Sequence, residues 1–223
     1  MKRLFLFMLL LCAFFQGSTA QTKEFFKENK HELRLSYGSV NDDSYYSRYH
    51  FHSGYNYYGY YGLGYYGNQP YYNMSVYQGA TKTTGVFSLS YFYNMPNPRF
   101  SFGATLSYSG FNTGIFNRVD DSKAGNTKSH NFAITPMVRY SWLSKEKLRL
   151  YSGIGWSFYA EKVNAEMEAK ASLSAVKQKE THYDNAFMIT PIGISFGKEL
   201  FVFGELNWGG RAGNIVGGVG YRF

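Results

Sequence analysis

The sequence predicts an all-β fold, an eight-stranded antiparallel up-and-down transmembrane β-barrel. Three observations predict it. The chain of 223 residues contains repeated segments in which bulky apolar and small polar residues alternate, the period of a strand with two different faces. There are eight such segments, an even number, as a closed single-chain barrel requires. Long and short connections alternate between them, which is typical of extracellular loops and periplasmic turns.

Residues 1–20 are predicted to be a cleaved signal peptide. Two basic residues precede a short apolar run, and Ala20 ends a set of small residues typical of a cleavage site. The run is shorter than the roughly 20 apolar residues of a spanning helix. Cleavage removes Cys12, the only cysteine, so the barrel domain, residues 21–223, is expected to have no disulfide.

Charge and hydropathy agree with this interpretation. The formal net charge is +8 and the basic residues are dispersed, so an exported chain is expected to contact outer-membrane lipid and lipopolysaccharide and no nucleic acid. The mean hydropathy of −0.35 fits a barrel as well as a soluble protein, because apolar residues occupy only alternate strand positions. A soluble lipocalin-type barrel, apolar inside, is disfavoured by the signal peptide and by the bulky face opposed to Gly, Ser, Thr and Arg.

The first strand is predicted at His31 to Val40, where odd-numbered residues from Leu33 to Tyr37 are apolar and even-numbered residues are polar or small. Residues 41–80 form a Tyr/Gly-rich low-complexity segment, predicted to be an extracellular loop. Tyrosine doublets in it place rings on both faces of a strand at once. Alternation returns in the second strand, at about 81–94.

The third, fourth and fifth strands follow with the same alternation. A turn with two prolines precedes the third, in which even-numbered residues from Phe100 to Tyr108 are apolar. A polar loop is predicted at about 111–130. The fourth strand, Phe132 to Trp142, and the fifth, Leu148 to Phe158, also carry their bulky residues at even positions.

Two interpretations stay open for the polar residues 161–182, a helix or two strands that extend above the membrane. In the sixth strand, Asn185 to Gly197, the apolar residues are odd-numbered before Pro191 and even-numbered after it. A β-bulge near Pro191 would reconcile the two facings. The seventh strand follows the turn at Lys198-Glu199, with Val202, Leu206 and Trp208 outward.

The eighth strand, Ile215 to Phe223, is predicted to pair with the first and close the barrel. Its outward residues Val219, Tyr221 and Phe223 resemble the C-terminal insertion signal that the barrel-assembly machinery reads in bacterial outer-membrane barrels. Its inward glycines, Gly218 and Gly220, are expected to make room for interior side chains, namely those of Arg34, Arg139 and Glu205.

Three segments, Ile189 to Gly197, Phe203 to Leu206 and Gly217 to Phe223, resemble the last three strands of small outer-membrane barrels of Bacteroidota. That family is the outer-membrane β-barrel domain grouped with OmpA-like and OmpX-like barrels. The resemblance is close over about 185–223 and architectural elsewhere. It implies the outer membrane of a Gram-negative bacterium, with both chain ends periplasmic, and no single activity.

The interior of an eight-stranded barrel is just wide enough for side chains to fill. The charged residues predicted to face it are Glu32, Arg34, Arg139, Arg149, Glu205 and Arg222. A polar network of Arg34, Arg139 and Glu205 is predicted there, in which Glu205 pairs with Arg34 or Arg139, because buried charges must be paired. Arg149 and Arg222, near the periplasmic end, are expected to reach water. A filled interior predicts no open channel, and a narrow gated pore is the second interpretation.

The tyrosine-rich loop is the candidate binding region. Tyrosine gives a large contact area at low entropic cost, and glycine, serine and asparagine give an adaptable backbone. The loop is predicted to bind a surface partner, either an outer-membrane protein or a glycan. The alternative is that its rings join the interfacial aromatic belt. The candidate residues are Tyr45, Tyr46, Tyr49, Tyr57, Tyr58, Tyr60, Tyr61, Tyr65 and Tyr66.

No pattern predicts catalysis, a metal or a cofactor. His50 and His52 flank one residue, but the spacing fixes no third ligand for a metal or haem. Ser129 and His130 are adjacent at a strand start and would face opposite sides, so they cannot serve as nucleophile and base.

The expected function is that of a non-enzymatic integral outer-membrane barrel, structural or surface-binding through long extracellular loops. Two alternatives stay open, a small porin-like channel for ions or solutes and an accessory subunit of a larger outer-membrane complex. A lipid-modifying enzyme is a third hypothesis.

Overall fold

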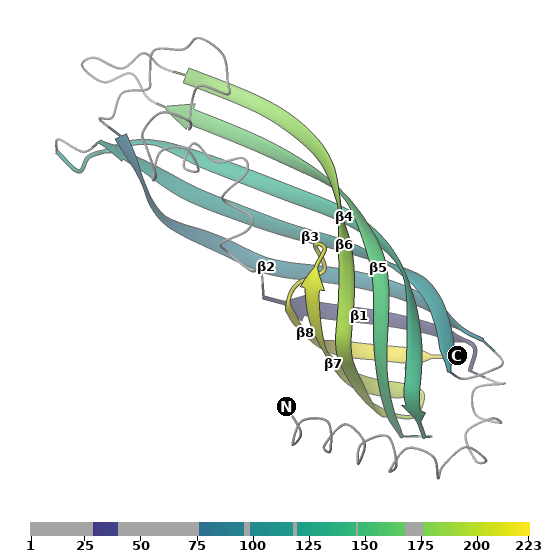
Figure 1. Ribbon diagram of the computed structural model, residues 1–223. Helices are drawn as coiled ribbons and strands as arrows, with labels where there is room; N and C mark the ends of the chain where they lie inside the picture. Colours follow the sequence, from purple (N-terminus) through teal and green to yellow (C-terminus); the bar gives the residue numbers. More distant parts are fainter. Residues whose placement is uncertain (1–28, 40–75, 96–98, 118–119, 146, 168–175) are drawn as a thin grey trace, which may run out of the picture.

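The computed structural model describes residues 29–39, 76–95, 99–117, 120–145, 147–167 and 176–223. They form a closed barrel in which each strand pairs with the next in sequence and β8 pairs with β1 (Figure 1). The predicted eight-stranded antiparallel up-and-down barrel is confirmed. No helix within these ranges is long and apolar enough to cross a membrane. The strands are β1 (His31–Gly38), β2 (Val76–Asn94), β3 (Phe100–Asn117), β4 (Lys123–Ser144), β5 (Leu148–Met167), β6 (Val176–Gly197), β7 (Leu200–Gly209) and β8 (Ile215–Arg222).

The seam between the first and last strands closes as predicted. β8 pairs β1 from Gly38↔Val216 to Glu32↔Arg222 without a shift of register. Beyond that register, the His31 N–H donates to the Phe223 carbonyl oxygen at 2.8 Å, and the Phe223 N–H donates to the His31 carbonyl oxygen at 2.9 Å. The Phe223 ring also stacks on the His31 ring. The aromatic end of the chain is therefore an integral part of the seam.

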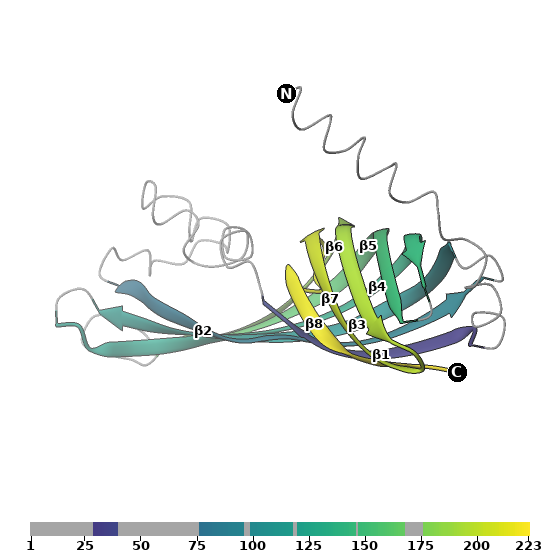
Figure 2. The same cartoon turned by 90° about the horizontal axis from the view of Figure 1, so that it is seen from below.

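The strands fall into two length classes. β1, β7 and β8 have 8 to 10 residues, whereas β2 to β6 have 18 to 22. The five long strands continue beyond the closed barrel as a curved sheet, which projects away from the end where the C-terminus lies (Figures 1 and 2). We call this part the projecting sheet.

The projecting sheet shortens the loops predicted at 41–80 and 111–130, and it decides between the two interpretations left open for 161–182. Most of the loop expected at 111–130 is strand, since β3 continues to Asn117 and β4 begins at Lys123. At 161–182 the structure shows the open alternative of two extended strands, β5 and β6. β2 likewise begins at Val76, inside the expected loop 41–80. Loss of apolar alternation therefore marks where the bulky apolar outer face ends, although backbone pairing continues beyond it.

The predicted bulge near Pro191 is confirmed. The register of β6 with β7 shifts between Ile189 and Ile192, and its register with β5 shifts between Tyr151 and Gly153. After the bulge, Ile192 and Ile194 face outward and are about half exposed. The extra residue therefore keeps the bulky side chains of β6 on the outer face on both sides of the proline.

The interior of the barrel contains aromatic rings that lie directly opposite glycines. A Cβ atom at any of these glycines would come too close to its partner's ring. The glycines therefore leave the inner wall open for one large side chain on each neighbouring strand. The cross-strand pairs are Phe92↔Gly103, Tyr151↔Gly193, Phe201↔Gly220 and Phe203↔Gly218.

Two of these pairs correct the expectation for the last strand. Gly218 and Gly220 make room for the rings of Phe203 and Phe201, and not directly for the charged network. The guanidinium groups then lie on those rings: the Arg222 Cζ is 3.9 Å from the centroid of Phe201, and the Arg34 Cζ is 4.4 Å from that of Phe203. The interior is thus a layered packing of charge on aromatic surface.

Candidate functional site

Glu32 is the centre of the charged cluster inside the barrel. It is fully buried, and its carboxylate accepts hydrogen bonds from Arg34 Nε at 2.6 Å, Arg139 Nη2 at 2.8 Å and Arg222 Nε at 2.9 Å. Arg149 Nη1 lies 3.7 Å from the same carboxylate. One anion therefore binds guanidinium groups from four strands, β1, β4, β5 and β8.

Glu205 forms the second anionic position. Arg34 Nη1 donates to its carboxylate at 2.8 Å, and the Tyr151 hydroxyl donates to the same oxygen at 2.6 Å. Of the two partners predicted for Glu205, the structure pairs it with Arg34, whereas Arg139 binds Glu32. Sequence reasoning placed Glu32 inside but missed its central role. The available signal was its position two residues before Arg34, on the same face of β1.

Arg149 and Arg222 differ from their expectation. Both side chains are 2% exposed and do not reach water. Arg149 donates to Ser141, Asn94 and Ser101, and Arg222 donates to the carbonyl oxygens of Gly197 and Lys198 in the β6–β7 turn. The end of the interior near the C-terminus is therefore covered by polar side chains and by a turn that folds over it. Paired hydrogen bonds make this burial tolerable.

The β7–β8 connection folds into the opposite end of the barrel. Ala212 is buried and packs in an apolar cluster with Phe92, Met137 and Met188. Positive φ values at Gly209, Gly210 and Gly213 (73°, 65° and 95°) permit the inward path.

Side chains of β3, β5 and β7 hold this connection in place. The Arg211 N–H donates to Ser157 Oγ, Ser107 Oγ donates to the Arg211 carbonyl oxygen, and Asn207 Nδ2 donates to the Gly213 carbonyl oxygen. The Arg211 guanidinium lies 4.2 Å from the centre of the Tyr159 ring. The connection acts as a plug, and the charged cluster lies beyond it, so the described interior is filled along its length.

Ser129 and His130 do not pair with each other, as predicted. Its buried hydroxyl donates to Glu161 Oε1 at 2.8 Å, whereas His130 lies on the outer face, bonded to the Tyr108 hydroxyl. The imidazole of His182, on the inner face beside Glu161, is 3.1 Å from Glu180. Among the described residues, no group of three or more His, Cys, Asp or Glu could hold a metal ion.

The remaining sequence candidates lie in two places. Val219, Tyr221 and Phe223 lie on the outer face, each about half exposed. The tyrosines proposed for partner binding, with His50 and His52, fall in residues 40–75 and lie outside the described residues.

Comparison with known proteins gives no match: no family model fits the chain, and no curated protein is similar enough to count as a relative.

Proposed function

We propose that this chain is a non-enzymatic integral outer-membrane protein with a closed lumen, which acts at the cell surface through its extracellular side. As part of the same proposal, we group it with the small OmpA-like and OmpX-like barrels that its last strands resemble. The observation that carries the proposal is an apolar outer belt around a filled polar interior.

The belt runs around the whole barrel. Monomeric soluble proteins rarely expose contiguous apolar patches of more than a few hundred Å², whereas here each of the eight strands exposes large apolar side chains on its outer face. Lipid is the solvent that makes such a surface favourable. Representative residues, one for each strand in order, are Leu35, Phe87, Leu106, Ile134, Ile154, Ile194, Val202 and Val219, each 47–59% exposed.

Aromatic contacts mark both edges of the belt, as expected of the girdles that flank a transmembrane barrel. At the edge near the C-terminus, His31 contacts Tyr93 and Phe223, and Phe223 stacks on Tyr221. At the other edge, Tyr108 packs on Phe132. The edges lie at the two ends of β1 and β8. Each of these strands has 8 residues, close to the 9–11 that a tilted spanning strand needs.

The filled lumen supports a surface role over a channel. An ion entering from the projecting sheet would meet the plug, then the apolar cluster and then the charged cluster. An ion has no compensating partner while it crosses the apolar layer, so its entry is unfavourable. The same plug also separates the side chains of the described interior from a substrate on the side of the projecting sheet.

The protein is expected in the outer-membrane fraction after carbonate extraction, and it should migrate faster on a denaturing gel before heating than after. In planar bilayers it should show no steady openings under conditions in which a reconstituted porin conducts. Recovery in the soluble fraction would overturn the membrane assignment. Steady openings would overturn only the closed lumen.

Partner binding is assigned in this proposal to the tyrosine-rich segment. Outer-membrane extracts passed over the intact protein should yield a bound partner, protein or glycan, that is lost when residues 44–77 are replaced by a Gly/Ser linker of equal length. The matched control replaces the nine candidate tyrosines by phenylalanine, which keeps ring area and removes the hydroxyls. Identical capture by all three proteins would remove this role from the segment.

A further inference from the structure

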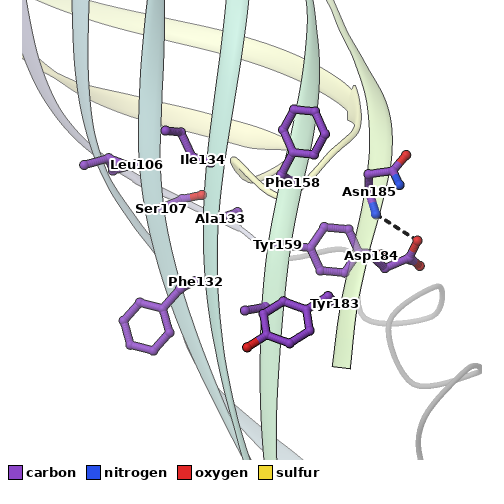
Figure 3. Close-up of a pocket in the computed structure, with 11 residues that line it drawn as sticks. Leu106, Ser107, Phe132, Ala133, Ile134, Phe158, Tyr159, Tyr183, Asp184 and Asn185 are labelled. Atoms are coloured by element: carbon purple, nitrogen blue, oxygen red, sulfur yellow. Dashed lines mark hydrogen bonds between the residues drawn. The ribbon is translucent and has the colours of Figure 1, made fainter. Parts of the chain in front are cut away.

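An open groove of about 770 Å³ lies at the edge of the apolar belt nearer the projecting sheet (Figure 3). Its outward lining comes from β3, β4, β5 and β6 and is apolar except for Asn185, whose amide oxygen accepts a hydrogen bond from Trp156 Nε1. Asp184 also borders the groove, and its carboxylate accepts a hydrogen bond from the Tyr159 hydroxyl. The apolar outward lining residues are Leu106, Phe132, Ile134, Phe158, Ala160 and Tyr183.

The hollow has a simple cause in the cross-strand register. Phe132, Ala160 and Tyr183 are direct neighbours on β4, β5 and β6. Ala160 therefore places one methyl group between two rings. The missing volume lets another apolar chain lie across β5.

Immediately beyond the groove, the outer face becomes basic. One ladder row consists of Lys82, Asn112, Lys128, Asn164 and Lys179, side by side on β2 to β6. The row between it and the groove contains His130, Lys162 and Thr181. The four lysines are exposed, and neither row contains a carboxylate. Lys128 and Lys162 are diagonal neighbours, with Cβ atoms about 7–8 Å apart, so both amines can reach one phosphate group.

We infer that this surface binds a phosphorylated lipid of the lipid A type, with an acyl chain in the groove and a phosphate at Lys128 and Lys162. The inference rests on the proposed function, which places this wall in the outer membrane. The rows lie at the end of the barrel opposite the C-terminus, which is the outer-leaflet side, and lipid A anchors the lipopolysaccharide of that leaflet. An apolar groove beneath lysines matches an anionic headgroup above its own chains. The outward carboxylate diagonal to Lys128, that of Glu166, lies 3.7 Å from the Lys177 amine.

The test is native mass spectrometry of the purified barrel in neutral detergent, titrated with lipid A, with phosphatase-treated lipid A and with phosphatidylglycerol. Wild-type protein should bind lipid A most tightly. The double substitution K128Q/K162Q should weaken that binding about 25-fold, because each lysine near a charged surface contributes about a factor of five and the two factors multiply. The matched control, K145Q/K147Q, makes the same charge change at exposed positions of the β4–β5 turn and should bind as wild type does.

A second pair of variants tests the groove. A160L fills the hollow between Phe132 and Tyr183 and should weaken lipid A binding without lowering the temperature of the heat-induced gel shift. A104L makes the same change on the outer face of β3, at a position that does not line the groove, and should have no effect.

Equal lipid A affinity in wild type and K128Q/K162Q would overturn the inference. Equally tight, lysine-dependent binding of phosphatidylglycerol would also overturn it, by reassigning the surface to glycerophospholipids. A protein that partitions into outer membranes but fails these titrations loses only this inference. A protein that does not partition there loses the proposed function as well.

Discussion

Replacing Glu32 by glutamine is expected to destabilise the barrel more than any other single interior substitution. The change removes the anion that binds Arg34, Arg139 and Arg222 and leaves Glu205 as the remaining carboxylate of the described cluster. Removing one partner of a buried ion pair costs about 3–5 kcal/mol, and here three pairs share that partner. We expect a loss at or above the upper end of that range, measured as the free energy of urea unfolding in lipid vesicles.

Two further variants separate charge balance from loss of a side chain. E205Q should cost less, because Glu205 is 12% exposed and binds one arginine. E32Q/R139M removes a cation together with the anion and keeps an unbranched chain against Phe92, so it should recover part of the lost stability. A double variant no more stable than E32Q would show that the hydrogen-bond geometry of Glu32, and not the charge balance, is what stabilises the cluster.

Gly220→Ala should also destabilise the barrel. Its methyl group would overlap the Phe201 ring, which cannot move freely because the Arg222 guanidinium lies 3.9 Å from its centroid. Overpacking of this kind costs about 1–3 kcal/mol. The matched control is Gly217→Ala on the outer face of the same strand, where a Cβ would be 3.9 Å from its nearest neighbour.

The pairing of glycine with ring can be measured directly by a double-mutant cycle. F201A alone leaves a cavity and should cost about 3–5 kcal/mol. In G220A/F201A the new methyl group no longer meets a ring, so the double variant should lose less than the two single variants together. Additive losses would mean that Gly220 and Phe201 do not pack against each other.

The closed barrel could be predicted because every strand with an apolar outer face and a polar inner face must alternate. The bulge at Pro191 could be predicted for the same reason. The apolar residues switch from odd to even positions between Ile189 and Ile192, and one extra residue in the strand keeps them on the same face. The projecting sheet could not be predicted in this way. Above the belt, Lys128 and Ser129 are both polar although they face opposite sides, so the two-residue period leaves no trace in hydropathy.

The candidate site was predictable in composition and not in connectivity. Alternation assigned Glu32, Arg34, Arg139 and Glu205 to the interior, but in a closed barrel any inward residue can meet any other across the lumen. Which carboxylate binds which guanidinium depends on strand tilt and stagger, which single-strand periodicity does not contain. The glycine–ring pairs depend on register between strands for the same reason.

The unequal strand lengths give the barrel a high wall, formed by β2 to β6, and a low wall, formed by β7, β8 and β1. In the membrane that we propose, a neighbour diffusing in the bilayer plane would meet only the belt when it approaches the low wall. From the other side it would meet a sheet that stands above the headgroups. The molecule would therefore present two different sides in the plane of the membrane. A neighbouring protein could then bind it in one rotational orientation about the membrane normal.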